Sequence, residues 1–516
     1  MSDSTRQRVP EDTRPLVAVD LGAESCRISM LSWRKGKPHV ELIHRFPNGP
    51  VRHPDGSLRW PLGQIVEGVE YGLKQCAAAT PEGIRSVAVD GWAVDYVRLD
   101  AAGVPLEDPF CYRDERSIAA EASLHGRVTT DRLRELTGIQ LQRLNSVYQL
   151  HADRLAGIPA GVRWLNLPEY LLARWGGTPV SEYTNATHTG MVELDQRVWS
   201  EEILAAAGID AATMPTLVPP GTILGTLSGD LAQLPAFHNT DLIAPACHDT
   251  ASAIAGIPAS GDDWAYISSG TWSLVGTVLE HSCNWPSTRG DGFTNLGGVG
   301  NRICFHRNVN GLWILKQCMD SWAEAGDAWD LAELLQQAEL AAAPDGLLEV
   351  DEPDLLLPGG MPGRINAQRL ACGFSAIDES AGGAPVMTRL ILEGLASRYA
   401  SVLTRLAANS GKTLRKLYVV GGGSRNALLQ RLTAEATGLE LHIGSAESST
   451  VGNFAVQLAA LEDAKPGGDG FCEAVADWAR CILDESGRLD TEHQDGAPLV
   501  PGRYPRKTEI GDRRTA

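Results

Sequence analysis

Residues 16–33 of the chain read LVAVDLGAESCRISMLSW. The apolar run at the start of this stretch, its glycine turn and the alternating residues of 26–33 predict two antiparallel strands joined by a tight turn. A second turn, KGKP at 35–38, leads to HVELIHRF at 39–46, which predicts a third strand. The chain is therefore expected to begin with an antiparallel meander whose first turn is DLGAESCR, residues 20–27.

The second half of the chain repeats this pattern. AYISSGTWSLVGTVLE at 265–280 again predicts a strand, a glycine turn and a strand. Residues 387–407 carry apolar side chains at helical spacing, and RKLYVVGGGSRNALLQRLTAEATG at 415–438 predicts a strand, a glycine-rich turn and a helix. Two related units of this kind predict an α/β fold with two lobes that face one another across a cleft.

Length and charge narrow the classes of function. At 516 residues the chain exceeds what one hydrophobic core normally supports, so two domains or more are expected. Its 45 Lys and Arg against 64 Asp and Glu give a net charge of −19. Such a surface repels phosphate backbones and anionic membranes, which argues against a nucleic-acid partner. The sequence has no apolar run long enough to span a bilayer, so a membrane role is not expected.

The two ends of the chain are polar. Residues 1–14 lack the apolar core of a secretory signal and are expected to form a disordered tail. Residues 486–516 are expected to form a flexible C-terminal tail. The ten cysteines include no C-x-x-C pair, which argues against a disulfide scaffold or a cysteine zinc site and favours a cytoplasmic protein.

Three glycine turns are candidates for binding an anion through backbone N–H groups. The first is DLGAESCR, where Arg27 adds positive charge and Asp20 is placed to hold Mg²⁺ through water. The second is SSGTWS at 268–273, which adds hydroxyl donors. The third, GGGSRN at 421–426, opens a helix but lacks the final glycine of the dinucleotide motif. Taken singly, each turn is equally compatible with an ordinary hairpin or loop.

Residues 246–254, ACHDTASAI, concentrate catalytic residue types. Cys247, His248 and Asp249 are consecutive, so their side chains diverge and cannot form a catalytic triad. No second cluster has metal-binding spacing. One carboxylate, Asp249, is left at the start of a predicted helix, where it is either a reactive group or only an N-cap.

The three glycine turns and the Asp249 segment, which lies between the first turn and the second, resemble those of a known family. The chain resembles the FGGY carbohydrate kinases of the actin, sugar-kinase and heat-shock ATPase superfamily, and within them the rhamnulokinases, from residue 17 to residue 460. The resemblance implies two ribonuclease-H-like (actin-like ATPase) lobes with a central cleft. A sugar-binding N-terminal lobe is expected at 15–255 and a nucleotide-binding C-terminal lobe at 256–485. Besides the three turns, the segments that carry it include SVAVDGWAVDYVRLD (86–100), YRDERS (112–117), EYTNATHTG (182–190), HDTASAI (248–254), RNVNGLWIL (307–315) and ESSTVGNFAVQL (447–458).

The resemblance also implies ATP and Mg²⁺. The first turn would approach the terminal phosphates, with Asp20 supporting the metal. Gly270 and Thr271 would face the phosphates from the other lobe, and Gly422 and Gly423 would lie against the nucleotide. The full set of residues expected at the nucleotide is Ala23, Glu24, Ser25, Cys26, Arg27, Gly270, Thr271, Lys316, Gly422 and Gly423.

On the sugar side, Asp249 matches the catalytic base of the family. It would accept the proton of the C1 hydroxyl of L-rhamnulose while ATP donates its γ-phosphoryl group, giving L-rhamnulose 1-phosphate and ADP in L-rhamnose catabolism. The partners implied are a neutral ketose and ATP, and the chain is expected to be a monomer or a homodimer. The residues expected at the sugar are Ala93, Arg113, His248, Asp249, Thr250 and Asn308.

The chain departs from the family pattern at several positions. Rhamnulokinases usually read D-L-G-A-S-S-G-R, where this chain has Glu24 and Cys26. They read D-T-W-G-V-D, where this chain has Gly91 and Ala93, and they often have glutamine at the position of Lys316. These departures leave L-fuculose or another ketose, or a sugar or nucleotide sensor without turnover, as alternatives. An actin-like or chaperone-like ATPase is a third alternative.

Overall fold

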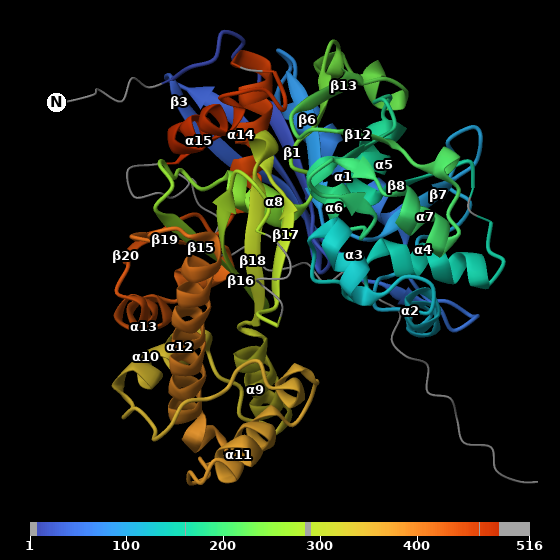
Figure 1. Ribbon diagram of the computed structural model, residues 1–516. Coiled ribbons are helices and arrows are strands. Elements are labelled where there is room, and N and C mark those ends of the chain that lie inside the picture. Colours follow the sequence, from blue (N-terminus) through green and yellow to red (C-terminus); the bar gives the residue numbers. More distant parts are fainter. Residues whose placement is uncertain (1–7, 160, 284–289, 464, 484–516) are drawn as a thin grey trace, which may run out of the picture.

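A computed structural model shows an α/β protein with two lobes, each built on a six-stranded sheet (Figure 1). Within the part of the chain that the structure describes, no helix is both long enough and apolar enough to cross a membrane. The described residues are 8–159, 161–283, 290–463 and 465–483.

The expected tails are described only in part. The C-terminal tail predicted at 486–516 lies outside the described residues, as do residues 1–7 of the N-terminal tail. The later residues of the N-terminal segment contact the folded chain. Arg85 donates a hydrogen bond of 3.1 Å to the carbonyl oxygen of Asp12, and Arg8 pairs with Asp463.

The first lobe is built on a mixed sheet with the strand order β13–β14–β6–β1–β2–β3. Strands β1, β2 and β3 form the expected antiparallel meander, whereas β6 runs parallel to β1 and β14 runs parallel to β6. The strands are β1 (Leu16–Leu21), β2 (Ser25–Arg34), β3 (Lys37–Pro47), β6 (Ser86–Gly91), β13 (Thr222–Thr226) and β14 (Asp241–Ala244). The helices that cover this sheet are α1 (Leu62–Ala79), α5 (Leu167–Arg174), α14 (Ser448–Glu462) and α15 (Phe471–Ile482).

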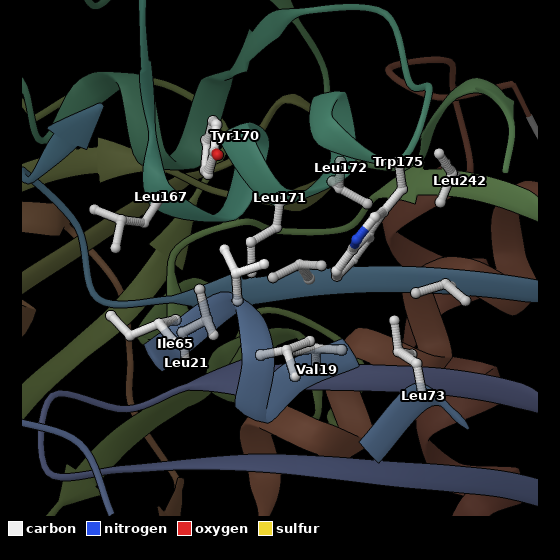
Figure 2. Close-up of a cluster of buried hydrophobic side chains, with 14 of the residues drawn as sticks. Val19, Leu21, Ile65, Leu73, Leu167, Tyr170, Leu171, Leu172, Trp175 and Leu242 are labelled. Atoms are coloured by element: carbon white, nitrogen blue, oxygen red, sulfur yellow. The ribbon is translucent and has the colours of Figure 1, made fainter. Parts of the chain in front are cut away.

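Strand β1 is buried on both faces, which decides where its carboxylate points. Val19 and Leu21 belong to the core between the sheet and helices α1 and α5 (Figure 2). Leu16 and Ala18 pack on the opposite face, in a core that includes residues of α14 and α15. Because side chains alternate along a strand, Asp20 lies on the α14 side of the sheet. Helices α14 and α15 were expected in the C-terminal lobe, and they pack against the N-terminal sheet.

Short helices dominate the chain between β6 and β13. This layer lies at the side of the first sheet (Figure 1). Its helices are α2 (Ser117–His125), α3 (Thr130–Thr137), α4 (Ser146–Leu155), α6 (Tyr183–Thr187) and α7 (Glu201–Ala207). The short strands of this lobe are β4 (Val51–Arg52), β5 (Leu58–Arg59), β7 (Tyr96–Leu99), β8 (Arg163–Asn166), β9 (Val180–Glu182), β10 (Val192–Glu193), β11 (Val198–Trp199) and β12 (Thr216–Val218).

The second lobe repeats the meander and the parallel strand in the order β17–β18–β16–β15–β19–β20. Strands β15 and β16 form the predicted hairpin, and the long predicted helix is α12, which crosses the lobe beside α13. The strands are β15 (Trp264–Ser269), β16 (Trp272–Leu279), β17 (Phe293–Gly297), β18 (Ile303–Asn310), β19 (Lys416–Val420) and β20 (Glu440–Ile443). The helices are α9 (Trp313–Glu324), α10 (Leu331–Leu340), α11 (Met361–Ala371), α12 (Ala384–Ser410) and α13 (Ala427–Thr437).

The two lobes meet where α14 crosses α8 (Asp249–Ala255). The crossing is close because glycines stand at the contact. A Cβ atom on Gly452 would overlap the carbonyl oxygen of Ser252, and one on Gly256 would overlap that of Ser448. The Ser448 hydroxyl donates a hydrogen bond of 2.7 Å to the carbonyl oxygen of Ala253. The two helices are therefore in backbone contact, with no room for larger side chains at these two positions.

Replacing Gly452 by alanine tests this crossing. We expect Gly452→Ala to lower the free energy of unfolding by about 1–3 kcal/mol, because the added methyl group forces the helices apart. Urea denaturation followed by tryptophan fluorescence measures the change. Gly63→Ala is the matched control, since no atom lies within 4 Å of the position of its Cβ on α1. A Gly452→Ala protein as stable as the Gly63→Ala protein would contradict the close crossing.

Candidate active site

Three aspartates meet where neighbouring strands of the first sheet end. Asp20 on β1 lies opposite Asp90 on β6 in the parallel register. Asp249 begins α8, and its segment is tied to the end of β6 by a 3.0 Å hydrogen bond from the Gly91 N–H to the carbonyl oxygen of Cys247. Burial, and then the charges of Asp20 and Asp249, raise the pKa of Asp90 well above its usual range. The carboxyl ends of parallel strands share one edge of a sheet, which explains why the three carboxylates gather there.

Arg27 is the cation of this cluster. It lies opposite Asp20 in the β1–β2 hairpin, and its Nη2 donates a hydrogen bond of 2.8 Å to Asp20 Oδ2. Its Nη1 pairs with Glu447, which precedes α14. The Ser449 hydroxyl donates to the same oxygen of Asp20 at 2.7 Å. The first turn thus places a fixed cation among the carboxylates, and its contact with phosphate stays a prediction.

Asp90 is a site residue that was not singled out from the sequence. One of its oxygens accepts a hydrogen bond of 2.7 Å from Asn453 Nδ2 on α14. The other oxygen, Oδ1, is buried and has no hydrogen-bond partner in the described structure. The sequence did contain a signal for this residue. SVAVD at 86–90 ends a strand with an aspartate, just as VAVD at 17–20 ends one with Asp20.

These carboxylates fit a magnesium ion. Mg²⁺ prefers carboxylate oxygens and keeps several of its waters, so one or two carboxylates together with substrate phosphates complete its shell. Asp20 and the unpartnered Oδ1 of Asp90 are oxygen donors of this kind. Across the described ranges, no three His, Cys, Asp or Glu side chains are grouped closely enough to hold a metal ion by themselves.

Asp249 has the electrostatics of a general base. It is the first residue of α8, with His248 at the N-cap position, and the His248 side chain makes no capping hydrogen bond. Burial and the charge of Asp20 raise the pKa of Asp249 to about 7. The Thr250 hydroxyl donates to Asp249 Oδ1 at 3.1 Å, and His248 Nε2 lies 3.4 Å from the same oxygen. A carboxylate with a pKa near neutrality is suited to proton transfer at physiological pH.

A cavity of about 310 Å³ opens beside Asp249. Four of the residues predicted at the sugar line it: Ala93, His248, Thr250 and Asn308. Asp249 is not a lining residue, but it contacts two residues that are, Thr250 and His248. Arg113 is not a lining residue, and its guanidinium lies 5.3 Å from the ring centre of Tyr112, which does line the cavity. The remaining lining residues are Trp92, Val94, Ile139, Gln140, Gln142, Leu144, Asn145, His188, Trp272, Leu274, Thr294, Leu296 and His306.

Three histidines of the cavity are held neutral. Burial lowers the pKa of His248 to about 3 and that of His306 to about 4. Burial and the neighbouring histidines lower the pKa of His188 well below its usual value. Since His248 carries no charge, its contact with Asp249 is not an ion pair, and the pKa of Asp249 stays raised. His188 and His306 were not singled out from the sequence, although His188 lies in the EYTNATHTG segment.

The second and third glycine turns, SSGTWS and GGGSRN, lie together in the second lobe. The N–H groups of Leu312 and Trp313 donate to the carbonyl oxygens of Gly270 and Thr271 at 3.0 and 3.2 Å. A Cβ on Gly423 would overlap the hydroxyl of Ser269, so the third turn packs directly against the end of β15.

Two more of the residues predicted at the nucleotide, Gly422 and Lys316, are exposed. No atom lies within 4 Å of a Cβ on Gly422, which leaves that position accessible to a ligand. Lys316 Nζ donates to Asp320 Oδ2 at 2.7 Å on the exposed side of α9.

Glu24 and Cys26, which depart from the family pattern in the first turn, do not add side chains to the cluster of carboxylates. Glu24 is exposed, and its carbonyl oxygen accepts a 2.9 Å hydrogen bond from the Asn48 N–H. The side chain of Cys26 is fully buried in the first core, where burial raises its pKa to about 12. The Cys26 side chain therefore cannot contact a nucleotide, and only the backbone of this residue is free to do so. Alternation along β2 puts Ser25 and Arg27 on the other face.

The departures near the sugar have packing roles. A Cβ on Gly91 would lie 2.6 Å from Leu21 Cβ, so β1 and β6 approach one another here more closely than a side chain at residue 91 would allow. Ala93 places a methyl group in the cavity wall. Its neighbour Val94 has a φ of 72°, which is strained for a β-branched residue, and its carbonyl oxygen accepts a 2.6 Å hydrogen bond from the Ser146 hydroxyl.

Family models match both halves of the chain. The N-terminal domain of the FGGY family of carbohydrate kinases matches residues 16–256, and the C-terminal domain matches residues 265–461. The chain is 36% identical to a rhamnulokinase of Enterococcus faecalis, over 88% of this chain and 91% of that protein. It is 33% identical to a rhamnulokinase of Bacteroides thetaiotaomicron, over 87% and 91%.

Solved structures share the fold at lower sequence identity. A xylulose kinase from Lactobacillus acidophilus superposes with a TM-score of 0.73 at 16% identity, covering 89% of this chain and 91% of that chain. A gluconate kinase from the same organism gives 0.74 at 16% identity, covering 90% and 92%. These likenesses confirm the predicted two-lobed, actin-like fold. Together with the family models, they show that this chain belongs to the FGGY family of carbohydrate kinases and is an ATP-dependent sugar kinase.

Proposed function

We propose that this kinase transfers the γ-phosphoryl group of ATP to the C1 hydroxyl of L-rhamnulose, giving L-rhamnulose 1-phosphate and ADP. The observation that carries the proposal is the position of Asp249, between an uncharged cavity and the cluster of Asp20 and Arg27. Relatives named rhamnulokinase, at 36% and 33% identity over most of the chain, support the choice of sugar.

In this proposal Asp249 accepts the proton of the attacking hydroxyl. Phosphoryl transfer needs alignment, neutralisation of charge and a group that takes this proton. Asp249 must be ionised to act, and its pKa of about 7 places it close to the working pH. Arg27 and the backbone N–H groups of the facing turns bind and orient the phosphates. Closure of the lobes would exclude water and limit hydrolysis of ATP.

Asp20 and Asp90 are the residues that would hold Mg²⁺. When bound together with ATP, the ion neutralises charge on the phosphate oxygens. The protein's own part is to fix the two carboxylates, through Ser449 for Asp20 and Asn453 for Asp90.

The lining of the cavity supports a neutral deoxyketose. The described residues that line it include no Lys, Arg, Asp or Glu. Its histidines are neutral, so no group there compensates the charge of an anionic sugar. Apolar side chains suit the C6 methyl group of L-rhamnulose, while imidazole and amide groups suit its hydroxyls. The aliphatic side chains of the lining are those of Ala93, Val94, Ile139, Leu144, Leu274 and Leu296.

A substrate panel tests the proposal. Purified protein receives ATP, Mg²⁺ and one of L-rhamnulose, L-fuculose, L-fructose, L-xylulose or glycerol, and both ADP and sugar phosphate are measured. We expect the highest kcat/KM with L-rhamnulose. L-fructose, which adds a C6 hydroxyl, should fall up to about a hundredfold lower, since an apolar pocket rejects a hydroxyl only moderately.

Each alternative predicts a different result in the same panel. Higher kcat/KM with L-fuculose would make that sugar the substrate, and activity on L-xylulose or glycerol but not L-rhamnulose would exclude the proposal. ADP formed without sugar phosphate would indicate an ATPase. No turnover with any sugar would indicate a sensor.

Asp249→Asn tests the base. We expect kcat to fall by about 10²–10⁴-fold, because the amide cannot accept the proton, while ATP binding measured by calorimetry stays close to wild type. Asp330→Asn is the control, since Asp330 starts a helix outside the cleft and only caps it, accepting from the Glu333 N–H at 3.0 Å. Wild-type turnover by Asp249→Asn would refute the assignment.

The pH dependence of kcat/KM gives an independent test. Activity requires ionised Asp249, so kcat/KM should fall about tenfold per unit as the pH drops below about 7 and level off above it. The positive charge of Arg27 lowers the pKa of Asp249, so Arg27→Met should move this acid limb to higher pH, with ATP kept saturating. An acid limb that stays in place, or moves to lower pH, would contradict this coupling.

A further inference from the structure

His188 has a ring nitrogen without a partner at the wall of the cavity. The residue follows α6 in the EYTNATHTG segment, to which the reaction itself assigns no role. Its Nε2 is buried and makes no hydrogen bond within the described structure. Its ring centre lies 3.9 Å from that of His248, with the planes inclined by 50°.

The backbone around His188 is fixed by side chains of the same lobe. Asn145 Nδ2 donates to the carbonyl oxygen of His188 at 2.8 Å. The buried Glu182 accepts from the Thr184 N–H at 2.8 Å and from the Cys247 N–H at 2.9 Å. It therefore ties the start of α6 to the segment that carries His248. The two imidazoles are held side by side before any sugar is present, which is the preorganisation that recognition requires.

A neutral imidazole is suited to a hydroxyl group. It offers one donor and one acceptor nitrogen, and a hydroxyl can serve as the partner of either. A buried nitrogen without a partner raises the free energy of the empty site, and a ligand hydroxyl removes this penalty. The second lobe contributes a similar residue to the same cavity, because Asn308 is a lining residue whose Oδ1 is buried and has no partner among the described residues.

We propose that His188 Nε2 hydrogen-bonds a secondary hydroxyl of the ketose, away from the C1 hydroxyl that is phosphorylated, and thereby selects substrates by hydroxyl position. His188 is then a specificity residue of the site, recognising a neutral polyhydroxy ketose from the first lobe while Asn308 faces it from the second. The inference rests on the proposed function for the position of the sugar. It requires no charge on His188.

His188→Phe tests the proposal, because phenylalanine keeps an aromatic ring beside His248 and removes the nitrogen. The ketose with the highest wild-type kcat/KM is compared with its 3-deoxy and 4-deoxy analogues. Wild type should prefer the parent over one analogue by tenfold or more. His188→Phe should lose about tenfold on the parent, little on that analogue, and so lose the preference.

A buried histidine outside the cavity provides the matched control. His151 bonds the carbonyl oxygen of Ala207 at 2.8 Å and lies near the Ser123 hydroxyl at 3.1 Å, so His151→Phe removes an imidazole of structural role only. We expect His151→Phe to change thermal stability and to keep the wild-type preference between parent and analogue. A His188→Phe enzyme that keeps this preference would overturn the proposal, whatever its total activity.

Calorimetric titration with the ketoses in the absence of ATP separates this inference from the proposed function. Ketose binding by wild type that weakens about tenfold in His188→Phe, without phosphorylation by either protein, would support the inference and reject the proposed reaction. Phosphorylation with equal ketose affinity in both proteins would reject the inference and support the proposed reaction. Wild-type protein that binds no ketose overturns the inference.

Discussion

The crossing of α8 and α14 is the contact on which the candidate site depends. Gly452 and Gly256 allow the two helix backbones to touch, and larger residues would overlap carbonyl oxygens of the opposite helix. One of these helices begins with Asp249. The other carries the residues that hold Asp20 and Asp90. Because both helices are fixed against each other, the three carboxylates keep their relative positions although they come from distant parts of the chain.

Helix α14 connects the site to the first sheet through a polar stripe. Ser449, Asn453 and Gln457 recur every four residues, so they lie on one face of the helix. Ser449 and Asn453 bind the two strand-end aspartates, and the Ser86 hydroxyl donates to Gln457 Oε1 at 2.6 Å. Buried polar groups are stable when they are paired in this way. The same hydrogen bonds that secure the helix against β1 and β6 therefore orient the carboxylates.

Charged and uncharged side chains occupy separate parts of the candidate site. Carboxylates and Arg27 gather at the strand ends, whereas the neighbouring cavity has neutral histidines, amides and apolar groups along its wall. Asp249 lies at the boundary, where nearby negative charge and burial raise its pKa to about 7. A protonated histidine beside it would lower that pKa. The burial of His248 thus affects both the recognition of a neutral ligand and the basicity of the proposed base.

Local patterns in the sequence determined the elements and several members of the site. Alternating apolar residues and glycine turns predicted the first meander and the second hairpin, helical spacing predicted the long helix, and the repeated pattern predicted the two-lobed fold. The motifs and the family resemblance predicted Asp20, Arg27, Asp249 and the sugar-side residues Ala93, His248, Thr250 and Asn308, which the structure places at the candidate site. Only the tertiary structure brought in Asp90, His188, His306 and the α14 stripe, and it turned the Cys26 side chain into the core. The physical reason is that a strand or helix is encoded by neighbours in sequence, whereas the burial that sets a pKa and the partner that a buried atom lacks depend on distant segments packing together.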